Sequence, residues 1–171
     1  MDIFIENIIK QKKTLPQFLI SMAIVFVAMI LIVLSIPLLS TAFGSIVLLI
    51  DAGFCYGAWF VVTSFNIEYE YCVTNGDVDI DKIMNKRRRK KAVSFKIKDI
   101  EIMAPVGCTN YSAEENGTFA RVIDASTKDA NDNPYYTICS IKGERVKIIF
   151  NPTPKMLEAF KPFAPRKIIE K

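Results

Sequence analysis

The chain has 171 residues, a net charge of +4 and an apolar content of 51%. It contains no histidine, which excludes the commonest general base, the usual Ser/His and Cys/His nucleophile pairs and most metal sites. Its four cysteines are far apart and form no Cys-x-x-Cys pair, so neither a structural metal nor a disulfide framework is expected. We therefore expect no metal and no cofactor.

The first segment, residues 1–14, carries Ile5, Ile8 and Ile9 at helical spacing. Two interpretations fit this cytoplasmic segment. It is either a short interfacial helix that lies among lipid head groups, or the first turns of the apolar helix that follows.

An apolar block, residues 15–65, follows and carries one formal charge, Asp51. A bilayer core needs about 20 apolar residues for each helical span. The block therefore predicts a two-helix transmembrane hairpin with spans at about 15–36 and 42–65. Lysines precede the block and the turn carries no charge, so the positive-inside rule predicts a multi-pass protein of the plasma membrane with both termini in the cytoplasm.

Asp51 is a candidate functional residue, because an ionisable group inside a span costs at least a few kcal/mol. Antiparallel folding of the spans places Met29 or Ile30 opposite it, so no partner is expected in the first span. Asp51 is then protonated and bonded to a backbone carbonyl, meets another subunit, or faces a partner membrane protein. Gly53 and Gly57 form a GxxxG pattern, which favours tight packing of the hairpin, with self-association and an ion path as alternatives.

From Ile67 the apolar pattern changes to a period of two, which is typical of strands. Asn75 and Gly76 then predict a hairpin with a two-residue turn. That turn pairs Val73 with Val78 and places the apolar side chains on one face of the hairpin.

Further strands and one helix complete a domain over residues 66–171. A bulge is expected near Asp99, and Thr153 caps a C-terminal helix at about 154–161. The predicted fold class is a membrane α+β protein, in which the helical hairpin is followed by a cytoplasmic antiparallel β-barrel or sandwich and one helix. The remaining strands are expected over residues 93–102, 119–125, 135–141 and 145–150.

Strands that end in one helix, which plugs the open end of a barrel, form the layout of pleckstrin-homology-like (PH-like) domains. The stretch from Tyr69 to Val78, the basic run from Lys86 to Lys91 and the Phe95-Lys-Ile-Lys-Asp-Ile100 segment resemble bacterial PH-like domains attached to membrane spans. The whole chain also resembles a family of small two-span Firmicute membrane proteins that carry this domain. The resemblance implies a fold and no catalytic residues.

Six consecutive cations follow the predicted hairpin: Lys86, Arg87, Arg88, Arg89, Lys90 and Lys91. The second strand returns toward the membrane, so this basic run is expected near the leaflet, where each cation contributes up to about 1 kcal/mol of attraction to anionic lipid heads. Alternatively, the cations balance the acidic outer face of the hairpin. No aromatic residue interrupts the run, so a nucleic-acid partner is not expected.

The favoured function is a non-enzymatic membrane protein that presents a binding or scaffold domain, with its basic run in contact with anionic lipids. The alternative is an accessory subunit of a membrane transport or envelope complex, which docks through Asp51, Gly53 and Gly57 on an unidentified membrane protein or a second copy. An enzyme is not expected, because the acidic residues show no catalytic spacing.

Overall fold

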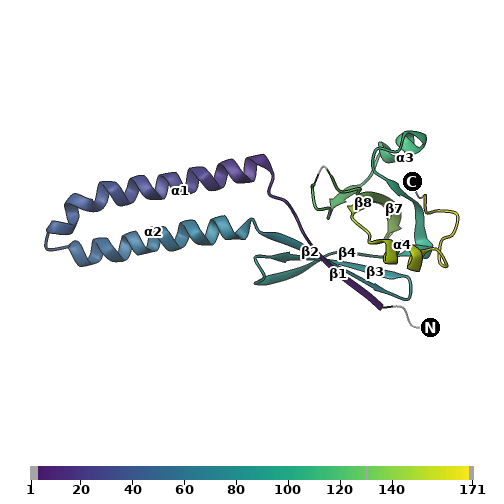
Figure 1. The fold of residues 1–171 in the computed structure, drawn as a ribbon, viewed down its shortest axis with the longest axis horizontal. Helices are drawn as coiled ribbons and strands as arrows, with labels where there is room; N and C mark the ends of the chain where they lie inside the picture. The colour runs from purple at the N-terminus through teal and green to yellow at the C-terminus, as the bar shows by residue number, and fades with distance from the viewer. Residues whose placement is uncertain (1–3, 130, 170–171) are drawn as a thin grey trace. The chain divides into compact units, whose positions relative to one another are not determined.

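The computed structural model describes residues 4–129 and 131–169 (Figure 1). The chain divides into two compact units. The helical unit is Lys13–Asn66, and the β unit combines the residues up to Lys12 with those from Ile67 onward. Each unit is described by itself below.

The helical unit consists of α1 (Leu15–Ser35), a 3₁₀ turn η1 (Ile36–Ser40) and α2 (Gly44–Ser64), with α1 and α2 side by side (Figure 1). The backbone N–H of Thr14 donates to Oε1 of Gln17 at 3.1 Å and so satisfies one free donor at the start of α1. The two predicted helices are confirmed, to within about two residues at each end.

Both apolar segments, Leu15–Ser40 and Gly44–Ser64, are long and apolar enough to cross a membrane. A core helix of a soluble protein passes the same test but is mostly buried. Here only 6% and 0% of the most apolar stretches are buried. The helical unit therefore exposes an apolar surface of the kind that a bilayer or a partner covers.

The first sheet of the β unit has the strand order β1-β2-β3-β4, and every pair is antiparallel. Its strands are β1 (Phe4–Lys10), β2 (Ile67–Thr74), β3 (Asp77–Met84) and β4 (Arg88–Lys96). The predicted hairpin between β2 and β3 is confirmed, because Val73 pairs with Val78. Asn75 and Gly76 have φ values of 47° and 86°, as a type I′ turn requires.

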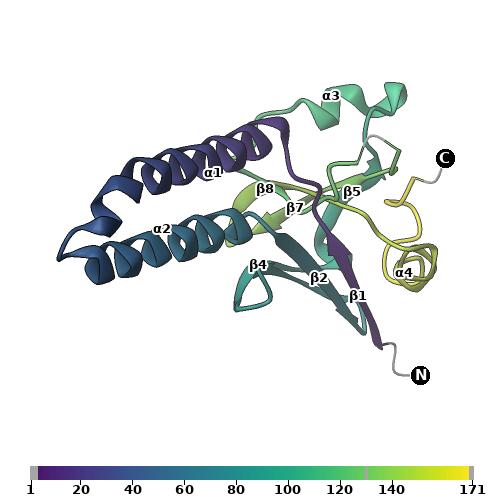
Figure 2. The ribbon, with the colours of Figure 1, turned by 60° about the vertical axis from the view of Figure 1, so that its left-hand side comes forward.

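Strand β1 shows that both interpretations of residues 1–14 are wrong, because it runs antiparallel along β2 (Figure 2). Burial alternates along it: Ile5 and Ile9 pack against the core, whereas Phe4 and Ile8 are exposed. The isoleucines thus follow a period of two with Ile8 on the outer face, and their helical spacing is incidental. The β unit begins before the helices, not at residue 66.

The second sheet has the order β5-β7-β8-β6, and β6 is parallel to β8. The prediction of purely antiparallel strands is wrong for this pair, and neither sheet closes into the predicted barrel within the described ranges. The chain changes sheet through a 3₁₀ turn (Ile97–Asp99) that keeps Ile97 fully buried, which explains the break in pattern near Asp99. The strands are β5 (Ile100–Pro105), β6 (Arg121–Asp124), β7 (Tyr135–Ile141) and β8 (Glu144–Phe150).

The predicted C-terminal helix is confirmed as α4 (Pro154–Phe160), which begins where Oγ1 of Thr153 accepts a hydrogen bond from the backbone N–H of Met156 at 3.3 Å. Its buried residues belong to one hydrophobic core with residues of both sheets. A 3₁₀ turn (Thr109–Tyr111) and α3 (Ser112–Glu115) lie between β5 and β6. The basic run and all the residues that surround it lie in the β unit.

Candidate functional site: a basic groove on the first sheet

The basic run from Lys86 to Lys91 is divided between a turn and a strand. Asn85, Lys86 and Arg87 form the turn between β3 and β4, with positive φ values of 48° and 54° at the first two positions. The residues from Arg88 onward already belong to β4. Because side chains alternate along a strand, the six cations do not share one face.

Cross-strand register arranges the outer face of the first sheet in rows. The row nearest the turn contains Lys10, Glu68, Ile83 and Arg89, one residue from each strand. The next row contains Ile8, Glu70, Asp81 and Lys91.

An open groove of about 550 Å³ lies at this end of the sheet. Five of its lining residues are cations and one is an acid, and two isoleucines add apolar surface. It is the candidate binding site and is called the basic groove below. Its lining residues are Ile8, Lys10, Glu68, Ile83, Lys86, Arg87, Arg88 and Arg89.

Part of the basic run balances local acids, as the charge-balancing alternative predicts. Arg89 forms an ion pair with the carboxylate of Glu70, whose side chain is 9% exposed. Nζ of Lys91 lies 2.7 Å from Oδ1 of Asp79. The hydrogen bonds from Lys91 and Ser94 lower the pKa of Asp79, and the same contact raises the pKa of Lys91. Arg89 and Lys91 therefore neutralise acids of the first sheet.

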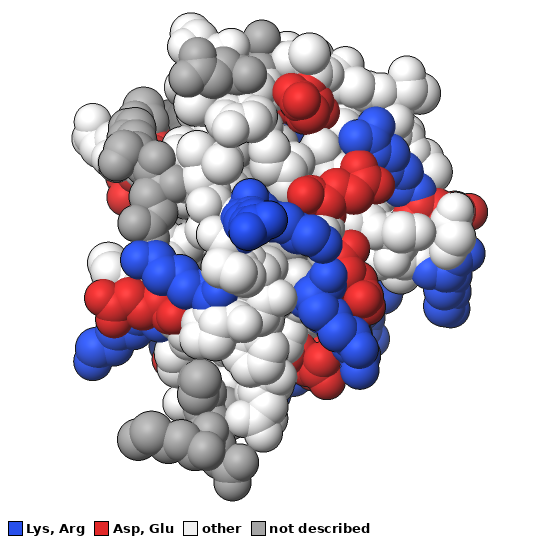
Figure 3. Space-filling view, turned by 90° about the vertical axis from the view of Figure 1, so that its right-hand side faces the viewer, with Lys and Arg blue, Asp and Glu red and all other residues white. Residues whose placement is uncertain are grey.

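The other cations leave a positive excess. Lys86, Arg88 and Lys90 are exposed, and none of them forms an ion pair within the part of the chain that the structure describes. Lys90 is also directly opposite Lys82, an unfavourable pairing of like charges. On the face shown in Figure 3, by contrast, cationic and anionic side chains lie beside one another. An anion bound at the turn would relieve this excess.

Glu68 is the acid in the basic groove, and its side chain is only 15% exposed. Nζ of Lys10 lies 3.9 Å from its Oε1, at the outer limit of an ion pair. Lys10 and Glu68 are absent from the predicted site. The unrecognised strand β1 explains this, because only the pairing of β1 with β2 brings Lys10 beside Glu68.

The predicted contact residues of the second helix lie in the helical unit, where Asp51 has a partner. Oγ of Ser35 donates a hydrogen bond of 2.7 Å to Oδ2 of Asp51. The expectation that the first helix offers no partner is therefore wrong. The 3₁₀ turn over Ile36–Ser40 prolongs α1, so the chain folds back later than residue 40 and brings Ser35 opposite Asp51.

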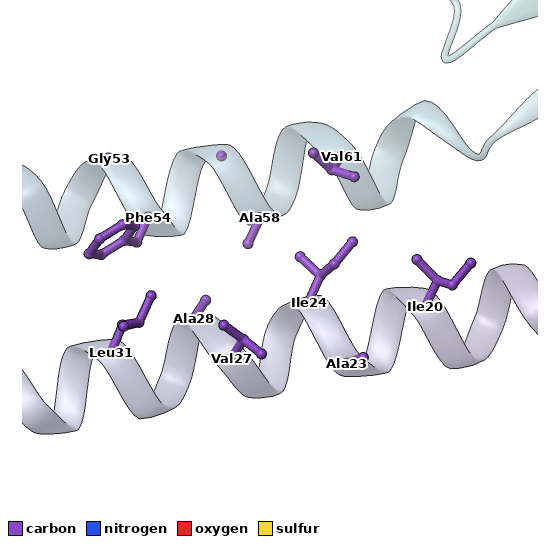
Figure 4. Close-up of a pocket in the computed structure, with 11 residues that line it drawn as sticks. Ile20, Ala23, Ile24, Val27, Ala28, Leu31, Gly53, Phe54, Ala58 and Val61 are labelled. Atoms are coloured by element: carbon purple, nitrogen blue, oxygen red, sulfur yellow. The ribbon is translucent and has the colours of Figure 1, made fainter.

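Gly53 and Gly57 are among the residues that line an apolar groove of about 470 Å³ formed by α1 and α2, and Figure 4 shows the lining residues. A Cβ atom added to either glycine would meet nothing within 4 Å. The favoured prediction of tight helix packing at this GxxxG pattern is thus wrong within the chain. The groove is lined by Ile20, Ala23, Ile24, Val27, Ala28, Leu31, Phe54, Ala58 and Val61 together with the two glycines.

Comparison with protein families matches residues 1–170 to a family described as "Bacterial PH-like domain (DUF6106)". The match includes the two apolar helices as well as both sheets. Neither the curated proteins nor the solved structures contain a match.

Proposed function

The chain belongs to this bacterial PH-like domain family, and we propose that it is a non-enzymatic membrane protein that presents a binding domain on the cytoplasmic leaflet. The predicted resemblance to PH-like domains is confirmed, and the family supports a binding or scaffold role. In this proposal α1 and α2 span the plasma membrane, and both termini are cytoplasmic. The basic groove contacts anionic lipid heads.

The observation that carries the proposal is the short chain connection between the helices and the end of the sheet that holds the basic groove. Strand β2 begins at Ile67, three residues after α2 ends at Ser64. An extended residue spans at most about 3.6 Å, so this connection reaches roughly 11 Å. Met84 pairs with Ile67. The turn of Asn85, Lys86 and Arg87, called the basic turn below, begins at the next residue. A membrane-spanning α2 would therefore keep the basic turn within reach of the leaflet.

The unpaired cations provide the attraction. Each cation held close to an anionic leaflet contributes about 1 kcal/mol. The attraction totals about 3 kcal/mol for Lys86, Arg88 and Lys90. This corresponds to roughly a 100-fold preference for the state in which the basic groove contacts the membrane. The helices keep the domain at high local concentration beside the membrane, so a preference of this size is sufficient.

Lipid binding by the full chain tests the proposal. The full-length protein in neutral detergent is titrated with phosphatidylglycerol or phosphatidylcholine, and bound lipid is counted by native mass spectrometry. We expect tighter binding of the anionic lipid and a loss of that preference when Lys86, Arg87 and Arg88 are replaced by Gln. The matched control replaces the exposed cations Lys142, Lys155 and Arg166 by Gln and should keep the preference. Equal binding of both lipids by the wild type would refute the proposal.

A second candidate function is favoured by the open groove of the helical unit. In this role a third apolar helix packs along the groove that α1 and α2 line, where Gly53 and Gly57 leave open space, and the chain serves as an accessory subunit of a membrane transport or envelope complex. Gly57→Leu should then remove crosslinks between the full-length protein and its partner in membranes, as should Asp51→Leu. Crosslinks that persist in both variants would argue against this role.

A further inference from the structure

We propose that the basic groove selects anionic phosphodiester lipid heads that also carry a hydroxyl group, and that Glu68 accepts the hydrogen bond of that hydroxyl. This inference rests on the proposed function and names the ligand class of the same groove. It begins with the one acid that lines the groove. An acid is unexpected in a site that only attracts negative charge, because it weakens the field of its cationic neighbours.

The structure leaves Glu68 with unused acceptor capacity. Arg89, the arginine in the same row as Glu68, pairs with Glu70 instead. Lys10 is the only ion-pair partner of Glu68 among the described residues, and it lies at 3.9 Å. No hydrogen bond to the Glu68 carboxylate occurs within the described ranges. A carboxylate has about four acceptor positions, so most of them are open to a ligand.

The remaining cations of the groove supply the complementary half of the site. Lys86 and Arg88 are exposed and without an ion pair in the described part of the chain, and both line the groove with Glu68. A phosphodiester satisfies such cations. A ligand that satisfies both halves therefore carries a phosphate and, a few bonds away, a hydrogen-bond donor.

The charge of the groove decides which donor fits. Five cations and one carboxylate line it, so a ligand with an ammonium donor would meet repulsion from the lysines and arginines. A hydroxyl donates to a carboxylate without adding positive charge. Glycerol phosphodiester heads supply a donor without adding positive charge, whereas ethanolamine heads supply a donor that does add positive charge.

The occupant is a lipid and not a free phosphodiester, because a membrane-spanning α2 would be joined by a short connection to β2, whose first residue, Ile67, pairs with Met84 just before the turn. Ile8 and Ile83 add apolar surface to the groove, which suits the glycerol carbons of a lipid head. A soluble head group lacks the high local concentration that a membrane supplies.

Native mass spectrometry of the full-length protein in neutral detergent tests the inference with four lipids. Phosphatidylglycerol is an anionic phosphodiester with hydroxyls, and phosphatidylmethanol is an anionic phosphodiester without them. Phosphatidylethanolamine carries an ammonium donor, and phosphatidylcholine carries neither donor. We expect phosphatidylglycerol to bind about threefold to tenfold more tightly than phosphatidylmethanol, which corresponds to one hydrogen bond to a charged group. Equal binding of these two lipids, with phosphatidylcholine weaker than both, would overturn the inference and leave the proposed function intact.

Glu68→Ala should reverse this order, because it removes the acceptor and also removes negative charge. We expect weaker binding of phosphatidylglycerol and stronger binding of phosphatidylmethanol. Glu68→Gln keeps an acceptor and should retain part of the preference. The matched control is Asp81→Asn, in the neighbouring row and outside the groove. It should strengthen the binding of both anionic lipids and leave the ratio of their affinities unchanged.

Three further results would overturn the inference. The first is a gain in affinity for both anionic lipids by the same factor in Glu68→Ala, which would mean that Glu68 acts only as a repulsive charge. The second is tighter binding of phosphatidylethanolamine than of phosphatidylglycerol. The third is displacement of phosphatidylglycerol by an equal concentration of soluble glycerophosphoglycerol, which would assign the groove to a free phosphodiester.

Discussion

The guanidinium of Arg89 pairs with the carboxylate of Glu70, one row farther along the sheet than the row in which Arg89 itself lies. This diagonal contact fixes one cation of the basic run against an acid that is almost buried. The neighbouring Arg88, on the other hand, lines the basic groove without an ion pair in the described ranges. Two consecutive arginines thus have different roles.

Arg89→Gln should destabilise the protein by about 1 to 2 kcal/mol, because it leaves the poorly exposed Glu70 carboxylate without its partner. Arg88→Gln should change stability by less than about 0.5 kcal/mol, as is usual for an exposed side chain. Thermal unfolding of the full chain in detergent measures both effects. Equal stability of the two variants would contradict the division of the basic run.

The helical unit should be dispensable for folding of the β unit, provided that β1 is kept. We expect a soluble, cooperatively unfolding protein when residues 13–66 are replaced by a flexible Gly/Ser linker. Residues 67–171 alone lack β1 and leave the edge of β2 unpaired, so they should melt at lower temperature or aggregate. Circular dichroism and size-exclusion chromatography compare the two proteins. Equal melting temperatures would show that β1 adds no stability.

Strand β1 also shows where prediction from the sequence stops. The hairpin at Asn75 and Gly76 and the capped helix after Thr153 are local features, and their turn and cap residues are sufficient to predict them. Strand β1 pairs with a strand about sixty residues later, across both apolar helices. Its alternation of Ile5, Asn7 and Ile9 was present in the sequence, but the adjoining apolar block favoured a helical interpretation.

The candidate site was predictable only in part, for the same reason. The basic run is visible as a cluster of charges in the sequence. Which of its cations are free depends on diagonal contacts, such as Lys91 with Asp79, and on the bulge between Ile80 and Asp81, which sets the register of β4. Lys10 and Glu68 come together only through tertiary pairing.

Tyr71→Phe should destabilise the β unit. The fully buried Tyr71 hydroxyl donates to the carbonyl of Ala125 at 2.6 Å and accepts from the backbone N–H of Asn151 at 3.2 Å, and burial raises its pKa. Loss of the hydroxyl leaves two backbone groups without this partner and costs about 1 to 3 kcal/mol.

Tyr69→Phe is the matched control for Tyr71→Phe. The Tyr69 hydroxyl donates a hydrogen bond of 3.1 Å to the carbonyl of Asp124, and its other partner is the side chain of Gln11, not a backbone group, so its loss should lower the melting temperature less. A larger decrease for Tyr69→Phe than for Tyr71→Phe would contradict the assigned role of Tyr71.

Cys139 should resist alkylation in the folded protein. Burial, with smaller contributions from Glu101 and Asp99, raises the pKa of Cys139 to about 11, so less thiolate is present at pH 8 than for an ordinary cysteine. The whole Cys139 residue is also only 1% exposed. Treatment with N-ethylmaleimide at pH 8 should modify the half-buried Cys72 and Cys108 first and Cys139 only after unfolding, as read by peptide mass spectrometry. Modification of Cys139 at the rate of Cys72 would contradict this burial.

Hydrogen–deuterium exchange at the basic turn tests the central claim most directly. The full-length protein is placed in nanodiscs of phosphatidylcholine alone or with added phosphatidylglycerol, and exchange of residues 84–91 is compared with exchange at the turn formed by Lys142 and Gly143. We predict slower exchange of residues 84–91 in the anionic nanodiscs at low salt, a difference that disappears at high salt, and no change at the comparison turn. Identical exchange of residues 84–91 in both kinds of nanodisc would contradict the binding of anionic lipid by the basic groove.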